Sequence, residues 1–247
     1  MKKLVSVLLC IAMLLSLACV VSAETEETTA PEIVWDENNE TILLEYGATY
    51  GEGEKSFQLV VDHLNQVVVC TVNTDEETVG AALAALNIVA GEDSQYGLMV
   101  NTIDGYTADY NVDGTYWAFY INGDYAMTGV DSTPIEDDTV YTFKVDGAEV
   151  EEGATISLVD GKHYGIGDTA FTLEVVDGEG NTTTVTVHTN EETLGAALAA
   201  LNIVAGEDSD FGLYIKTVNN VTADYDTDGK YWAFYIDGEY AMTGVDA

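Results

Sequence analysis

Residues 80–94 read Gly-Ala-Ala-Leu-Ala-Ala-Leu-Asn-Ile-Val-Ala-Gly-Glu-Asp-Ser, and residues 195–209 repeat this stretch without a change. The match extends on both sides, so that residues 74–131 correspond to residues 189–246 at an offset of 115. An internal repeat of this length indicates that one building block occurs twice in the chain.

The repeat continues upstream more loosely, at an offset of 114, where Tyr50-Gly51 corresponds to Tyr164-Gly165. Each copy has about the size of one small domain. The predicted organisation is a signal peptide at 1–23, an N-terminal segment at 24–41, a first copy at 42–146, a linker at 147–155 and a second copy at 156–247.

Strand patterns surround one helical pattern in each copy. Alternating or β-branched stretches at residues 57–61, 67–72, 116–121 and 140–145 predict strands. Asn122-Gly123 in the first copy, like Asp237-Gly238 in the second, is typical of a two-residue type I′ hairpin turn. One helix among several strands predicts an α+β unit, with a mostly antiparallel sheet and the helix packed across it.

The helix carries clear start and stop signals. Thr74-x-x-Glu77 and Thr189-x-x-Glu192 have the pattern of capping boxes. Val79, Leu83 and Leu86 then form one apolar stripe, flanked by alanines that would let the helix lie close to a sheet, and Asn87 is a stop signal.

These motifs resemble a known family. Thr-Val-Gly-x-Ala-Leu, Tyr-Gly-Leu, Tyr-Trp-Ala-Phe-Tyr-Ile-Asn-Gly and Gly-Val-Asp, all between residues 78 and 131, resemble DUF4430 modules, which are secreted bacterial domains similar to the C-terminal domain of transcobalamin and intrinsic factor. The resemblance covers residues 42–247 in two tandem copies and implies β-grasp-like units. It also implies cobalamin as a ligand, although the separate helical barrel with which the vitamin carriers enclose cobalamin is not encoded here.

The charge balance excludes several partners. Seven Lys+Arg against 44 Asp+Glu give a formal net charge of −37. Nucleic-acid binding needs clustered cations, and so does docking on an anionic membrane surface, so neither is expected. The chain also lacks the Gly-x-Ser-x-Gly and His-Glu-x-x-His motifs, and no histidine recurs between the copies, so we expect no catalysis.

The N-terminus predicts export. Met1-Lys2-Lys3, an apolar run from Leu4 to Val21 and Ser22-Ala23 have the pattern of a cleaved signal peptide. The expected location is therefore extracellular, by secretion from a bacterium. The alternatives are an uncleaved membrane anchor and a surface lipoprotein attached through Cys19. Cleavage leaves Cys70 as the single cysteine, expected to be a small buried side chain.

The aromatic hairpins are the candidate ligand-binding residues. On a strand, Trp117, Phe119 and Ile121 face one side and the neighbouring tyrosines the other. The Trp-Phe-Ile side should be buried, while exposed tyrosines would suit a ligand, unless other strands or the sister copy cover them. The predicted ligand-binding set is Tyr116, Trp117, Tyr120, Tyr125, Tyr231, Trp232, Tyr235 and Tyr240.

Acidic turns offer candidate metal ligands. Oxygen-bearing side chains alternate before a glycine, as in the first half of a calcium loop, but the closing Glu is absent. Such turns are also common without a metal. The candidate calcium ligands are Asp109, Asn111, Asp113, Asp224, Asp226 and Asp228.

The second copy ends at Ala247, without a counterpart of residues 140–145. We therefore expect an open sheet edge there, filled by Ile33–Trp35 or by Ile42–Leu44 from within the chain or from a neighbouring copy, which would make a strand-donation oligomer. Two functions remain open at this point. The first is a secreted, non-catalytic binding protein for a small molecule such as a corrinoid, and the alternative is a structural or adhesive surface module that binds proteins or glycans.

Overall fold

The computed structural model describes residues 41–95, 97–148, 153–210 and 212–246. The predicted signal peptide, Cys19 and Ile33–Trp35 lie outside these residues. The chain divides into two compact units between Val150 and Glu151. Each helix in the described ranges falls short of the length and apolarity that a bilayer crossing needs.

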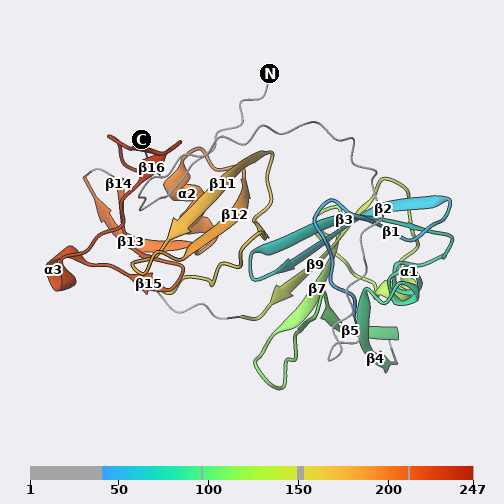
Figure 1. Ribbon diagram of the computed structural model, residues 1–247. Coiled ribbons are helices and arrows are strands. Elements are labelled where there is room, and N and C mark those ends of the chain that lie inside the picture. The colour runs from blue at the N-terminus through green and yellow to red at the C-terminus, as the bar shows by residue number, and fades with distance from the viewer. Residues whose placement is uncertain (1–40, 96, 149–152, 211, 247) are drawn as a thin grey trace, which may run out of the picture. The chain divides into compact units, whose positions relative to one another are not determined.

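The first unit contains most of the regular structure (Figure 1). Its elements are β1 (Thr49–Tyr50), β2 (Lys55–His63), β3 (Gln66–Thr74), α1 (Val79–Ala85), β4 (Val89–Ser94), β5 (Gly97–Ile103), β6 (Tyr106–Thr107), β7 (Tyr116–Ile121), β8 (Asp124–Tyr125), the 3₁₀ turn η1 (Val130–Ser132) and β9 (Val140–Asp146).

The main sheet of the first unit has the order β1-β3-β2-β9-β7-β8. β2 and β3 form an antiparallel hairpin, as predicted, whose turn residues Leu64 and Asn65 both have positive φ. β9 is parallel to β2 on one side and antiparallel to β7 on the other. A smaller antiparallel sheet contains β4, β5 and β6.

The second unit has the same opening elements. They are β10 (His163–Tyr164), β11 (Thr169–Val176), β12 (Thr182–Thr189), α2 (Leu194–Ala200), β13 (Val204–Ser209), β14 (Gly212–Val218), β15 (Val221–Thr222), α3 (Tyr225–Asp228), β16 (Tyr235–Ile236) and β17 (Glu239–Tyr240). β11 and β12 are antiparallel, β10 is parallel to β12, and β16 pairs with β17. With few helices and several sheets, the described residues fit the predicted α+β class.

The helices begin later than the sequence pattern suggested. The N-cap of α1 is Thr78, whose Oγ1 accepts the Ala81 amide at 3.3 Å, and Thr193 caps α2 in the same way. Thr74 lies at the end of β3 and its hydroxyl accepts the Glu76 amide instead. The predicted capping boxes are therefore wrong, because Thr74 and Thr189 are the last residues of strands.

Small side chains matter at the start of each helix. A Cβ atom on Gly80 would collide with the Asp131 carboxylate and with the backbone of η1. Gly195 has the same relation to Asp246. Ala84 and Ala85 are exposed, so the close contact is made at Gly80 and Ala82 and not by the whole run of alanines.

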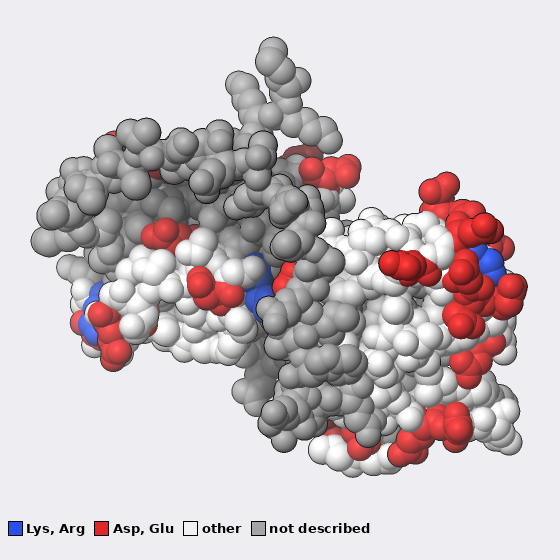
Figure 2. All heavy atoms as spheres, turned by 45° about the vertical axis from the view of Figure 1, so that its right-hand side comes forward, with Lys and Arg blue, Asp and Glu red and all other residues white. Residues whose placement is uncertain are grey.

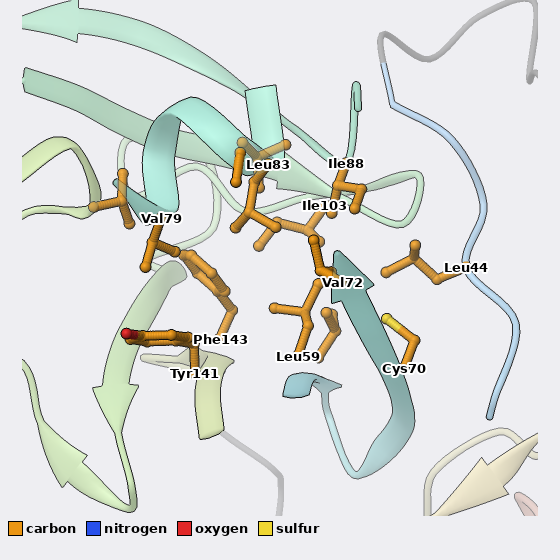
Figure 3. Close-up of a cluster of buried hydrophobic side chains, with 14 of the residues drawn as sticks. Leu44, Leu59, Cys70, Val72, Val79, Leu83, Ile88, Ile103, Tyr141 and Phe143 are labelled. Carbon is orange, nitrogen blue, oxygen red and sulfur yellow. The ribbon is translucent and has the colours of Figure 1, made fainter. Parts of the chain in front are cut away.

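The core of the first unit lies between α1 and the main sheet. Val79 and Leu83 of the helix point toward Leu59 and Val72 of the hairpin and toward Tyr141 and Phe143 of β9 (Figure 3). These side chains are at most 1% exposed. Ile42 and Leu44 are also part of this core, at 1% and 2% exposure, so the prediction that they could fill an edge of the second unit is wrong.

Candidate functional site

The best-formed candidate surface lies at the end of the β7–β8 hairpin. Asn122 and Gly123 both have positive φ, as the predicted type I′ turn requires. Tyr120 and Tyr125 are cross-strand neighbours whose rings meet edge to face, with centroids 5.4 Å apart. The Ala126 amide donates to the Phe119 carbonyl at 2.9 Å and fixes the chain just beyond β8.

This hairpin end presents a tyrosine and a methionine to solvent. Tyr125 is 56% exposed and Met127 is 93% exposed. We call Tyr125 and Met127 the first Tyr/Met tip. Tyr and Met are both enriched at protein interfaces relative to other surface, because they offer large, adaptable apolar contact area.

The second unit repeats the tip with almost the same geometry. Tyr235 and Tyr240 meet edge to face at 5.5 Å, and the Ala241 amide donates to the Phe234 carbonyl at 3.0 Å. Tyr240 and Met242, the second Tyr/Met tip, are 55% and 92% exposed. The two tips therefore keep the same exposure in two copies whose sheets differ.

The other members of the predicted aromatic set lie in different surroundings. Trp117 is only 8% exposed, packs edge to face on Tyr106 and donates its Nε1–H to the Asn101 carbonyl at 3.2 Å. It belongs to the core, as the alternation pattern predicted, and is not part of an exposed contact face. Tyr116 and Tyr231 are 39% and 52% exposed.

Tyr116 is tied to its own sheet. Its hydroxyl donates to the Asp146 carboxylate at 3.2 Å, and this hydrogen bond raises the pKa of the Tyr116 phenol. Trp232 and Tyr235 are half-buried. Among the aromatic and apolar side chains of residues 116–127 and 231–242, those of the tips and of Tyr231 are more than half exposed, and those of Tyr116 and Ile236 are less so.

In the acidic turns, the carboxylates accept hydrogen bonds from backbone amides of the same turn. Asp109 accepts the Asn111 amide at 2.9 Å, and Asp113 accepts both the amide and the hydroxyl of Thr115, at 2.9 and 2.6 Å. These hydrogen bonds to Thr115 lower the pKa of the Asp113 carboxyl.

In the second unit Asp224 caps α3 and accepts Lys216 Nζ at 3.2 Å, which lowers the pKa of Asp224. Asp226 and Asp228 follow in α3, and Asp228 accepts the Lys230 amide. Across the described ranges, no three His, Cys, Asp or Glu side chains gather as metal ligands. The hydrogen bonds of Asp109, Asp113 and Asp224 stabilise these turns, and the calcium ligands stay a prediction.

Several strongly exposed residues are not in the predicted ligand-binding set. Met127 and Met242 were overlooked, as were Tyr110 and Tyr225, which are 71% and 63% exposed. The sequence did contain a signal for these exposed positions. Asp-Tyr and Tyr-Ala-Met occur in both copies, at places where core packing does not require a large side chain. An apolar residue repeated at a turn, rather than in a strand, marks such a position.

The reactive side chains lie apart from the tips. Cys70 is 2% exposed, and burial raises the pKa of its thiol to about 12, so it is the buried small side chain that was predicted. His163 of β10 and His188 of β12 form a pair, in which His163 Nδ1 lies 2.9 Å from His188 Nε2 and the rings are stacked. Burial lowers the pKa of both imidazoles.

Carboxylates far outnumber lysines among the charged side chains of the protein. Figure 2 shows many Asp and Glu side chains and few Lys on the visible face of the described residues. Each of the ion pairs formed by Lys55, Lys144 and Lys216 joins a lysine to a carboxylate of the same unit. An uncharged or cationic partner is therefore favoured over an anionic one.

Comparison with known proteins places these features in a family. Residues 76–147 and 191–247 match the model of a domain of unknown function, DUF4430. No curated protein matches the chain.

Two solved structures align with parts of it. A "putative metal binding protein" from Ruminococcus gnavus ATCC 29149 aligns with 29% identity and a TM-score of 0.37, over 39% of this chain and 100% of that one. Haptocorrin in complex with Cbi aligns with 17% identity and a TM-score of 0.32, over 40% of this chain and 27% of the haptocorrin chain. Because the two matches to the family model together span just over half of the sequence, the protein belongs to the DUF4430 family, with two tandem copies of the domain.

Proposed function

We propose that the protein is an exported, non-catalytic binding protein that contacts its ligand through the two Tyr/Met tips. The observation that carries the proposal is the repeated exposure of Met127 and Met242, at 93% and 92%. A methionine this exposed contributes nothing to a core. Its value is in contact area that becomes buried when a partner binds.

The fold supports a binding role through the contacts that hold the chain on either side of Tyr125 and Tyr240. Each tip follows a type I′ turn that is closed by a tyrosine pair and a backbone hydrogen bond. We infer β-grasp-like units, because β2 and β3 form a hairpin, a helix follows, and β9 returns parallel to β2. A rigid scaffold that presents loop-borne Tyr and Met lowers the entropic cost of binding.

Two ligand classes fit this proposal. A corrinoid is the small molecule that the motif resemblance to the transcobalamin C-terminal domain suggests, and its flat apolar faces would suit Tyr and Met side chains. A surface protein or glycan is the alternative, for an adhesive module. Export from a bacterium, by cleavage after Ala23, would place either ligand outside the cell.

The test titrates the chain with cyanocobalamin, by calorimetry and absorbance, and screens it on a glycan array. The double variant Met127→Ser/Met242→Ser is compared with Met99→Ser, because Met99 lies on β5 and is 57% exposed but belongs to neither tip. We expect the double variant to weaken binding about tenfold or more and the control to bind like the original chain.

The result separates the alternatives. A tip-dependent heat and spectral change with cyanocobalamin supports the corrinoid, while tip-dependent glycan binding without them supports the adhesive module. Binding that is equal in the double variant and in Met99→Ser would remove the tips from the proposal.

A further inference from the structure

A cavity of about 370 Å³ lies in the second unit, beside the segment that repeats the sequence of β7. Its wall includes Val221 of β15 and three aromatic residues of the predicted ligand-binding set, Tyr231, Trp232 and Tyr235. Val221 and Tyr231 are 41% and 52% exposed, so the cavity opens to solvent. Ligand pockets commonly measure about 300–1,000 Å³, and this cavity therefore has the size for one small molecule.

In the first unit a tyrosine ring packs at the corresponding place. Tyr106 is the counterpart of Val221, and its ring meets the indole of Trp117 edge to face, with centroids 5.9 Å apart. The same phenol ring stacks on the imidazole of His63, with centroids 5.4 Å apart. Three rings thus pack together next to the β7 strand.

The second unit has only one of these three rings. Val221 and Asp177 stand at the positions of the tyrosine and the histidine, while Trp232 repeats the tryptophan. Val221 and Trp232 both line the cavity, as does Gly178, the neighbour of Asp177. The cavity therefore lies among the counterparts of residues that contact a phenol ring in the first unit.

The indole of Trp232 lacks the hydrogen bond that its copy makes. Trp117 Nε1 donates to the Asn101 carbonyl at 3.2 Å, but Trp232 Nε1 is buried without an acceptor in the described part of the chain. A buried N–H without an acceptor is costly, so a bound molecule that carries an oxygen atom is favoured over a hydrocarbon.

A lysine adds a second donor at the cavity. Lys230 lines it, is exposed, and takes part in none of the ion pairs found among the described residues. Asp226 and Asp228 of α3 precede this lysine closely in the chain. Their negative charge disfavours an anionic ligand, so the donors favour an uncharged molecule with an oxygen acceptor.

We propose that this cavity binds a free, uncharged small molecule with a single phenol-type ring. The ring packs against the indole of Trp232 as the Tyr106 side chain packs against Trp117, and its oxygen accepts a hydrogen bond. Aromatic pairs in this geometry are more favourable than their buried area alone accounts for. The site goes beyond the proposed function, because neither Tyr240 nor Met242 of the second Tyr/Met tip lines the cavity.

The probe is p-cresol, which is the tyrosine side chain as a free molecule. We expect saturable one-to-one binding by calorimetry, with a dissociation constant on the order of 1 mM, and a shift of the Trp232 indole N–H signal in the NMR spectrum. Toluene lacks the oxygen, and 4-methylcyclohexanol lacks the flat ring. Each should bind about fivefold more weakly than p-cresol, or worse.

The decisive variant is Val221→Tyr, which restores the ring that the first unit carries. It should abolish p-cresol binding, because the new side chain fills the cavity. The matched control is Val221→Thr, which keeps the shape of the side chain at a partly exposed position and should bind like the original chain. Met242→Ser should also bind p-cresol unchanged, which separates the cavity from the tip.

Three results would overturn the proposal. They are no binding of p-cresol up to about 10 mM, equal binding by Val221→Tyr and Val221→Thr, and binding of toluene and 4-methylcyclohexanol as tight as that of p-cresol. Binding of N-acetyltyrosinamide about tenfold tighter than that of p-cresol would also overturn it, because the occupant would then be a tyrosine side chain of a polypeptide and not a free molecule.

Discussion

The hexapeptide Tyr-Trp-Ala-Phe-Tyr-Ile has two structures in this molecule. In the first unit all of its residues belong to β7, and in the second only Tyr235 and Ile236 belong to a strand. The local sequence is identical, so propensity does not explain the difference. Strand structure here depends on a pairing partner, because a strand's stability comes mainly from its cross-strand and packing contacts.

The helices behave in the opposite way. α1 and α2 have equal length and equivalent N-caps, and Asn87 and Asn202 follow them with the same φ of +53°. Each helix is specified by signals within a few residues, so both copies keep it whatever the rest of the sheet does. The two units therefore separate local from long-range control of structure.

The largest expected effect on stability comes from truncating a buried side chain of β9. Phe143 is 1% exposed and its ring lies 5.0 Å from that of Phe119. Phe143→Ala should lower the free energy of unfolding of the first unit by about 3–5 kcal/mol. It should also leave residues 116–119 as accessible to hydrogen exchange as residues 231–234.

The control is Phe234→Ala in the second unit, at the position of Phe119 but half-buried. Its loss of stability, measured by denaturant unfolding followed by hydrogen exchange, should be clearly smaller than that of Phe143→Ala. Equal losses would mean that β9 does not account for the difference between the units.

The Gly-Val-Asp motif gives a prediction in which both units should agree. Asp131 accepts the Leu98 amide at 2.6 Å and lies against Gly80, and Asp246 accepts the Leu213 amide at 2.7 Å beside Gly195. Gly→Ala usually stabilises a helix interior. Here Gly80→Ala and Gly195→Ala should each destabilise the protein by about 1–3 kcal/mol, because the added methyl group displaces the carboxylate.

The matched control is Ala84→Gly, at an exposed position of the same helix. It should cost about 1 kcal/mol through helix propensity alone. A gain of stability from Gly80→Ala would show that the Asp131 contact does not constrain the start of α1. Thermal unfolding by circular dichroism measures all three variants.

The sequence predicted the repeat, the strands, both type I′ turns and the family, because these features are written in local patterns and in the match between copies. It misplaced the N-cap, because Thr74 and Thr78 both precede acidic or apolar residues in a plausible capping pattern. Thr74 cannot act as the N-cap because it belongs to β3, where Asn73 and Thr74 pair with Ser56 and Lys55 of β2. That pairing lies outside the few residues that a capping pattern covers. The pairing of His163 with His188 is hidden for the same reason, since β10 and β12 supply one histidine each.

Substitutions of the N-cap residues Thr78 and Thr193 should have a smaller effect on the free energy of unfolding. Thr78→Ala and Thr193→Ala remove the side-chain acceptor of the third helical amide, and each should cost about 1 kcal/mol. Val is the more informative replacement at Thr74, since it suits a strand, and Thr74→Val should cost less than Thr78→Val. The opposite ranking, in urea unfolding of matched variants, would restore the capping box.

The least pronounced difference between the units is their response to acid. The pKa values of His163 and His188 are lowered from the usual 6.5, mainly by burial. As the pH falls through 6.5, unfolded imidazoles take up protons before the folded ones do, so the unfolded state binds more protons and the second unit loses stability. The loss is complete once the pH is below the folded pKa values of both histidines.

Hydrogen exchange of the β11 and β12 amides between pH 7.5 and 5, corrected for intrinsic exchange rates, measures this loss within the second unit. The variant His163→Gln/His188→Gln should keep its stability more nearly constant over that range, because glutamine does not titrate. Asn73 stands at the position of His188 in the first unit, and Thr49 at that of His163, so the first copy already lacks the pair. An equal acid response of the double variant and the original chain would assign the effect to carboxylates instead.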